Sequence, residues 1–131
     1  MTSEQSKKKS TGARLKIQAR LMLDDEIAFG PGKADLLIAI QSTGSISAAG
    51  KHLGMSYRRA WLLVDAMNRC FQQPLVETAT GGTQGGGTRL TSLGLDVIAR
   101  YQQLQQDIHA LGEKHFPELK PLLRKKPLPL A

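Results

Sequence analysis

Two short helical segments on either side of a glycine corner constrain this 131-residue chain more than any other feature of its sequence. Ser45 is an expected N-cap for a helix that continues to Leu53, because its hydroxyl can accept a hydrogen bond from a free backbone N–H. Gly54 is expected to end that helix, since glycine adopts the left-handed conformation without steric penalty. Ser56 can cap a second helix. The pattern predicts two consecutive helices joined by a tight turn.

Small residues stand where these two helices would cross. Gly50 precedes the turn glycine by four residues and Ala60 follows it by six, so the helices can approach closely near a right angle. The buried stripe of the second helix is expected to consist of Ala60, Val64, Met67 and Phe71. Its opposite face would hold Arg58, Leu62, Asp65 and Arg69. This pattern is typical of a helix-turn-helix.

Two arginines begin the second helix, where the helix dipole is positive. A cation at this end is disfavoured by roughly 0.3–1 kcal/mol, so Arg58 and Arg59 make little sense for stability alone. They make sense if an anion such as DNA phosphate, or a guanine edge, docks there. Solvated surface arginines are the alternative. Trp61 is expected to anchor the core rather than an interface, whereas Tyr57 could reach phosphate or pack under the turn.

Five glycines occur among the seven residues 81–87, between two segments with strand character, 75–80 and 88–91. A phosphate-binding P-loop is excluded because no Lys followed by Ser or Thr comes after these glycines, and no G-x-G-x-x-G is present. The sequence instead predicts a β-hairpin with an extended tip, known as a wing. Backbone N–H groups, Thr83, Gln84 and Arg89 could contact phosphates or the minor groove. A plain flexible loop is the alternative.

The segment before the two helices is expected to form a hairpin and a first helix. Residues 13–23 alternate between apolar and polar side chains, which predicts a half-buried strand. Residues 24–26 are expected to supply a turn, and residues 27–29 to return as a short partner strand. Gly30-Pro31-Gly32 is expected to break the chain before a helix over 33–42 that ends at Thr43-Gly44.

A long helix is expected over 92–115, capped by Thr91. Its apolar side chains follow a heptad-like spacing that predicts a homodimer, with a helix used only in its own core as the alternative. A dimer would present two recognition helices to major grooves about 34 Å apart and favour a palindromic site. The predicted dimerisation residues are Val97, Tyr101, Leu104, Ile108 and Leu111.

The expected fold class is α+β, mainly α: a winged helix-turn-helix with an N-terminal β-hairpin and a long C-terminal dimerisation helix. The expected organisation is a disordered basic tail at residues 1–12, the DNA-binding domain at 13–115, and a Pro/Lys/Arg-rich tail at 116–131. The four prolines among residues 116–131 argue against a long helix in this second tail. The two tails are either solvated or auxiliary DNA arms.

Composition narrows the class of protein. Eighteen Lys plus Arg against eleven Asp plus Glu give a net charge of 18 − 11 = +7, so a polyanion is the first partner to consider. The longest apolar runs are far short of the roughly 18–20 residues that span a bilayer, and no secretory signal is found. Cys70 is alone, and His52, His109 and His115 are scattered. We therefore expect a cytoplasmic, non-enzymatic protein without metal, cofactor or membrane attachment.

The runs GSISAAGKHLGMSYRRAWLLVDAMN and LVETATGGTQGGGTRLTSLG resemble the N-terminal winged-helix domain of the ModE family of molybdate-responsive bacterial regulators. That helix-turn-helix is similar in turn to those of LysR-type regulators, and the resemblance covers about residues 13–112. It implies a dimeric DNA-binding repressor or activator, with repression as the expectation, and a link to molybdate transport or metabolism. The S-A-R-N signature of the family's oxyanion-binding molbindin module is not found, so we expect no molybdate binding by that route.

The residue chemistry and the resemblance together give the expected function, a sequence-specific regulator that binds double-stranded DNA at a palindromic operator. The alternatives are a winged-helix protein-interaction module that partners a larger regulator and a small oxyanion-binding protein with the wing glycines as its anion site. The expected DNA-binding residues are Ser45, Ser47, Lys51, Ser56, Tyr57, Arg58, Arg59, Arg69, Thr80, Gly82, Thr83, Gln84 and Arg89.

Overall fold

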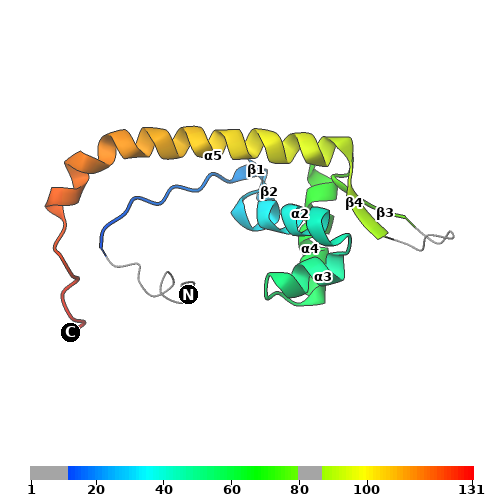
Figure 1. The fold of residues 1–131 in the computed structure, drawn as a ribbon, viewed down its shortest axis with the longest axis horizontal. Coiled ribbons are helices and arrows are strands. Elements are labelled where there is room, and N and C mark those ends of the chain that lie inside the picture. Colours follow the sequence, from blue (N-terminus) through cyan, green and yellow to red (C-terminus); the bar gives the residue numbers. More distant parts are fainter. Residues whose placement is uncertain (1–11, 80–86) are drawn as a thin grey trace. The chain divides into compact units, whose positions relative to one another are not determined.

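The computed structural model describes residues 12–79 and 87–131, and Figure 1 shows its fold. The described residues form two strands, three helices, two further strands and a long helix, in that order. This mainly helical α+β arrangement is the predicted fold class. The chain divides into two compact units, one formed by Gln18–Gln105 and the other by residues 12–17 together with Gln106–Ala131.

The N-terminal hairpin is shorter than the sequence predicts. Strand β1 (Leu21–Leu23) pairs antiparallel with β2 (Glu26–Phe29), and Asp24 takes a positive φ of 53° in the turn between them. The prediction of a strand is therefore confirmed for the last three residues of 13–23 and wrong for the eight before them.

Hydrogen bonds at Ala19 show what takes the place of a partner strand at that residue. Its backbone N–H donates to Oε1 of Gln105 at 2.7 Å, and its carbonyl accepts from the hydroxyl of Tyr101 at 2.8 Å. The backbone of Ala19 is thus satisfied by side chains instead of by a partner strand. The alternating sequence pattern correctly indicated an extended segment but could not reveal what pairs with it.

Helix α2 (Pro31–Thr43) begins two residues earlier than predicted. The expectation that Gly30-Pro31-Gly32 only breaks the chain is wrong, because Pro31 occupies the first helical turn, where its missing N–H costs no hydrogen bond. The end of α2 is confirmed. Gly44 has a φ of 74°, and its N–H donates to the carbonyl of Ile40 at 2.7 Å.

The predicted helix-turn-helix and hairpin follow. Helices α3 (Ile46–His52) and α4 (Tyr57–Cys70) form the helix pair. Strands β3 (Val76–Ala79) and β4 (Gly87–Leu90) pair antiparallel in a continuous register, which confirms the expected hairpin. The expectations about its tip concern residues 80–86, which lie outside the described residues.

The last helix, α5 (Ser92–Leu119), is longer than predicted. Thr91 caps it as expected, because its Oγ1 accepts from the N–H of Gly94 at 3.0 Å. The helix continues through Pro117, so the prediction that residues 116–131 form a non-helical tail is wrong for its first four residues. A proline this close to a helix end removes only one backbone hydrogen bond. A short 3-10 turn, Lys120–Leu122, follows.

The hydrophobic core of the Gln18–Gln105 unit receives buried side chains from β2, from the helices α2, α3, α4 and α5, and from β3 and β4. Its largest fully buried side chains are Phe29, Leu36, Leu37, Ile40, Val64, Met67 and Leu75. The prediction that Trp61 anchors this core is wrong, because Trp61 is 39% exposed. No helix in the described part of the chain is both long and apolar enough to cross a membrane.

Candidate nucleic-acid interface

The corner between α3 and α4 has the predicted hydrogen bonds. The hydroxyl of Ser45 accepts from the N–H of Ala48 at 3.0 Å, and that of Ser56 accepts from the N–H of Arg59 at 3.0 Å. Gly54 has a φ of 73°, the left-handed conformation that most side chains disfavour. Both caps and the turn glycine are therefore confirmed.

The two helices cross where the small residues were expected. A Cβ added to Gly50 would lie 3.1 Å from the Cβ of Ala60 and 3.5 Å from the carbonyl oxygen of Met55. Both Gly50 and Ala60 are buried. A larger residue at either position would push the helices apart, so this contact fixes the direction in which α4 leaves the corner.

Helix α4 has one buried face and one exposed face. Ala60, Val64 and Met67 are buried as predicted, whereas Phe71 is only partly buried and lies just beyond the helix end. The face turned away from the core carries four exposed residues, Arg58, Leu62, Asp65 and Arg69. This face is available to a partner.

The arginines of the domain fall into two groups. Arg69, Arg89 and Arg100 each pair with a carboxylate, within 3.0 Å. In contrast, among the described residues no carboxylate lies within ion-pair distance of Arg58 or Arg59, both of which are exposed. The first turn of α4 also contains no acidic residue. Arg14 and Arg20 are likewise exposed and have no ion pair among the described residues, but only Arg58 and Arg59 stand at a helix start, where the dipole favours an external anion.

Arg69 is the most strongly held of the paired arginines. Its Nη1 and Nη2 donate to the two carboxylate oxygens of Glu26 at 2.8 and 3.0 Å, and its Nε donates to Asp65 at 2.9 Å. These hydrogen bonds raise the pKa of Arg69 and lower the pKa of Glu26. Arg69 therefore links α4 to β2, and most of its donors are already used within the chain.

Two aromatic side chains flank the exposed arginines. Tyr57 is 60% exposed and does not pack under the turn. Its ring contacts Trp61 edge-on, with 6.3 Å between ring centroids and 76° between ring planes. On α3, Ser47 and Lys51 are also exposed, and Lys51 lies in the last turn. The corner thus combines basic, hydroxyl and aromatic groups.

Asn68 joins α4 to the hairpin. Its Oδ1 accepts from the N–H groups of Leu75 and Val76 at 2.8 and 3.3 Å, and its Nδ2 donates to the carbonyl of Val76 at 3.2 Å. The N–H of Thr88 in β4 donates to the carbonyl of Gly44 at 3.0 Å. The hairpin is therefore fixed to α4 through β3 and to the end of α2 through β4.

Replacing Asn68 with alanine is expected to destabilise the domain by about 2 kcal/mol, because the buried N–H groups of Leu75 and Val76 lose their acceptor. Urea unfolding of the variant and of the wild type measures the difference. Gln72→Ala is the control, since Gln72 is exposed and close in sequence. Equal stabilities for Asn68→Ala and Gln72→Ala would contradict this role.

The predicted wing contacts are only partly described. Arg89 is paired across the hairpin with Glu77, at 2.8 Å between Nε and Oε2, and the two residues are directly opposite in the strand register. The other predicted wing residues lie outside the described residues, namely Thr80, Gly82, Thr83 and Gln84.

Lys33 is a buried cation near the corner that the sequence patterns did not single out. It is 8% exposed, and burial lowers its pKa, with nearby Cys70 and Glu26 opposing that shift and Arg59 adding to it. Cys70 is half-buried and free, as expected. Within residues 12–79 and 87–131, no group of three or more His, Cys, Asp or Glu residues is arranged to hold a metal ion.

The predicted dimerisation residues divide between the two units. In the Gln18–Gln105 unit, Val97 and Tyr101 pack partly against the core, whereas Leu104 is 46% exposed. In the other unit, Ile108 is half-buried and Leu111 is 56% exposed. The seam therefore contributes to each unit's own packing and still leaves apolar surface exposed.

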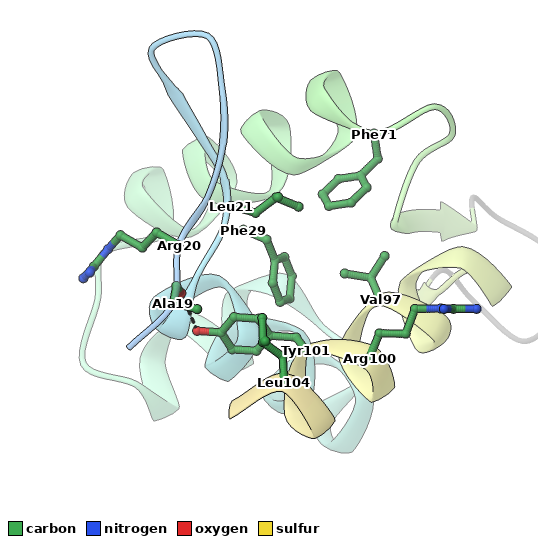
Figure 2. Close-up of a pocket in the computed structure, with 9 residues that line it drawn as sticks. All are labelled: Ala19, Arg20, Leu21, Phe29, Phe71, Val97, Arg100, Tyr101 and Leu104. Atoms are coloured by element: carbon green, nitrogen blue, oxygen red, sulfur yellow. Dashed lines mark hydrogen bonds between the residues drawn. The ribbon is translucent and has the colours of Figure 1, made fainter. Parts of the chain in front are cut away.

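A mainly apolar pocket of about 290 Å³ lies beside the first part of this seam (Figure 2). The hydroxyl of Tyr101 is engaged with the carbonyl of Ala19 at its edge, and burial raises the pKa of Tyr101. In Figure 2 the guanidinium groups of Arg20 and Arg100 point away from the middle of the pocket. Its other lining residues are Leu21, Phe29, Phe71, Val97 and Leu104.

A capped helix pair with a close crossing, followed by an antiparallel hairpin fixed to its second helix, defines a winged helix-turn-helix domain. Residues 33–95 match the family of bacterial regulatory helix-turn-helix proteins of the lysR family. The fold is similar to a solved structure described as the CbnR_DBD–DNA complex, with a TM-score of 0.52 and 18% identity over 67% of this chain and 95% of that one. The chain therefore contains a LysR-type helix-turn-helix domain.

Over this domain the chain is ModE-like, as its motifs indicated. It is 42% identical over 106 residues to the transcriptional regulator ModE of Yersinia pestis, which covers 81% of this chain and 36% of that protein. It is also 42% identical over 89 residues to the molybdenum transport protein ModE of Azotobacter vinelandii, covering 66% of this chain and 33% of that protein. The chain spans about a third of the length of these relatives.

Proposed function

We propose that this protein is a DNA-binding transcriptional regulator of the ModE type, acting in the bacterial cytoplasm by occupying its operator. The observation that carries the proposal is the pair of unpaired guanidinium groups, Arg58 and Arg59, at the start of a helix with an exposed outer face. The similarity to the transcriptional regulator ModE of Yersinia pestis supports it. The proposed role is binding rather than catalysis.

The proposed contacts follow from the groups that remain available. Arg58 and Arg59 would enter the major groove, while Tyr57, Ser47 and Lys51 would contact the sugar-phosphate backbone. Ser45 and Ser56 would act mainly as caps, since their oxygens already accept backbone N–H groups. Of the wing residues, Thr80, Gly82, Thr83 and Gln84 remain proposed contacts. Arg89 remains one too, because it would give up only a single, exposed ion pair with Glu77.

Arg69 is left out of this proposed interface. Binding DNA through it would require breaking its hydrogen bonds with Glu26 and Asp65. Arg58 and Arg59 carry no comparable cost. The proposed base-reading surface is therefore limited to the first two turns of α4.

Selection from a randomised duplex pool with the purified protein tests the proposed function. Because a dimer presents two copies of α4, we expect the enriched sequences to share one motif with two-fold symmetry. Failure to enrich any motif, with only weak binding that salt removes completely, would contradict sequence-specific regulation.

We further propose that the chain is a homodimer through α5. The exposed apolar side chains of Leu104 and Leu111 support this, because a second copy would remove them from water. Sedimentation equilibrium is expected to give twice the chain mass of 14.3 kDa for the wild type and a monomer for the Leu104→Glu/Leu111→Glu variant. Ala110→Glu, at an exposed position of the same helix, is the single-site control. A monomeric wild type would contradict the proposal.

A further inference from the structure

An apolar side chain stands in the middle of the exposed face of α4. Leu62 is 52% exposed and follows Arg58 by four residues, so it lies one helical turn further along the same face. It is two residues from fully buried Ala60, which puts it on the side of the helix opposite to the core. A polar residue is the usual choice for such a position in a helix that faces only water.

The surroundings of Leu62 favour a polyanion over an apolar protein surface. The helix start beside it carries the unpaired Arg58 and Arg59 and no acidic residue. Beyond it on the same face, the carboxylate of Asp65 is held by Arg69 at 2.9 Å. The nearest negative charge on this face is thus already compensated and does not oppose the approach of phosphate groups.

Duplex DNA offers one apolar group at the base edges of the major groove, the 5-methyl group of thymine. A leucine one helical turn beyond two arginines that contact phosphate or guanine would meet base edges rather than backbone. We propose that Leu62 packs against a thymine methyl group and thereby selects a T·A pair in each half-site. This inference rests on the proposed function and adds to it a base-reading residue and the base that it reads.

The aromatic residues beside Leu62 are placed for a different contact. Trp61 lies about 100° around the helix from Leu62, and its ring is held edge-on by Tyr57. From the side of the helix these rings would face the groove wall, where sugar and phosphate lie. Leu62 is therefore the apolar side chain of α4 best positioned for a base edge.

Replacing single thymines with uracil tests the proposal, because uracil lacks only the methyl group. The probe is the highest-affinity duplex recovered from the randomised pool, with each thymine changed in turn. For the wild type we expect one position in each half-site at which uracil weakens binding about threefold to tenfold, the effect of one buried methyl group. Leu62→Ala is expected to bind the thymine and uracil probes equally at that position.

One control variant and three distinct outcomes separate the possible failures. Ile38→Ala, at an exposed apolar position on α2, is expected to keep the full preference for thymine. A wild type that binds every uracil probe as tightly as thymine, or a Leu62→Ala variant with undiminished preference, would overturn the inference and leave the proposed function standing. If no duplex is enriched at all, both the proposed function and this inference fail.

Discussion

Replacing Arg58 and Arg59 together with alanine is expected to weaken binding to the selected duplex at least about thirtyfold, because each contact to a base edge or phosphate contributes about 1–3 kcal/mol. Both side chains are exposed, so the fold is expected to be unchanged. Fluorescence anisotropy with a labelled duplex measures the affinity, and thermal unfolding measures the stability.

The Arg100→Ala/Lys114→Ala variant is the matched control for this experiment. It also removes two positive charges, in this case from exposed positions on α5. This variant is expected to bind the duplex within about threefold of the wild type. Comparable losses in the two double variants would mean that overall charge drives binding, and the proposed role of the α4 start would then be wrong.

Replacing Gly94 with alanine is expected to cause the largest loss of stability of any single change considered. Gly94 is buried in the first turn of α5, and an added Cβ would overlap the backbone carbonyl of Leu75. Because the obstacle is backbone, it cannot move aside as a flexible side chain would. Overpacking of this kind costs about 3 kcal/mol, which lowers the melting temperature by more than about 10 °C in a domain of this size.

Gly32→Ala provides the control for Gly94→Ala. Gly32 is exposed in the first turn of α2, and no atom lies within 4 Å of an added Cβ. Alanine there is expected to raise the stability by about 0.5 kcal/mol, because the unfolded chain loses conformational freedom. Equal melting temperatures for the Gly94→Ala and Gly32→Ala variants would contradict the close packing of α5 on the hairpin.

Local chemistry explains why the helix-turn-helix could be predicted in detail. Ser45 and Ser56 cap the helices, and Gly54 turns the chain, through interactions with residues only a few positions away. The close approach of Gly50 and Ala60 follows from their small size and their distance from the turn. These features depend on a short stretch of sequence, so the sequence alone was enough.

The errors arose where the outcome depends on distant residues. The backbone of Ala19 is satisfied by Gln105, 86 positions away, and not by a strand. The prediction that Arg69 contacts DNA is untested, but nothing in the local sequence indicated its pairing with Glu26, which comes 43 positions earlier in the chain. No sequence pattern predicted that the side chain of Asn68 holds the hairpin. The one hint was the position of this polar residue beside the buried stripe of α4. Trp61 was misjudged because aromatic character suggested burial.

Titration of the uniformly ¹⁵N-labelled protein with the selected duplex, followed by amide NMR spectra, tests the central claim most directly. If α4 and the hairpin form one DNA-binding surface, the largest shifts are expected at Tyr57–Leu62 and in β3 and β4, with small shifts in β1 and β2. Large shifts confined to β1, β2 or the Lys120–Leu122 turn, with α4 unaffected, would contradict the account.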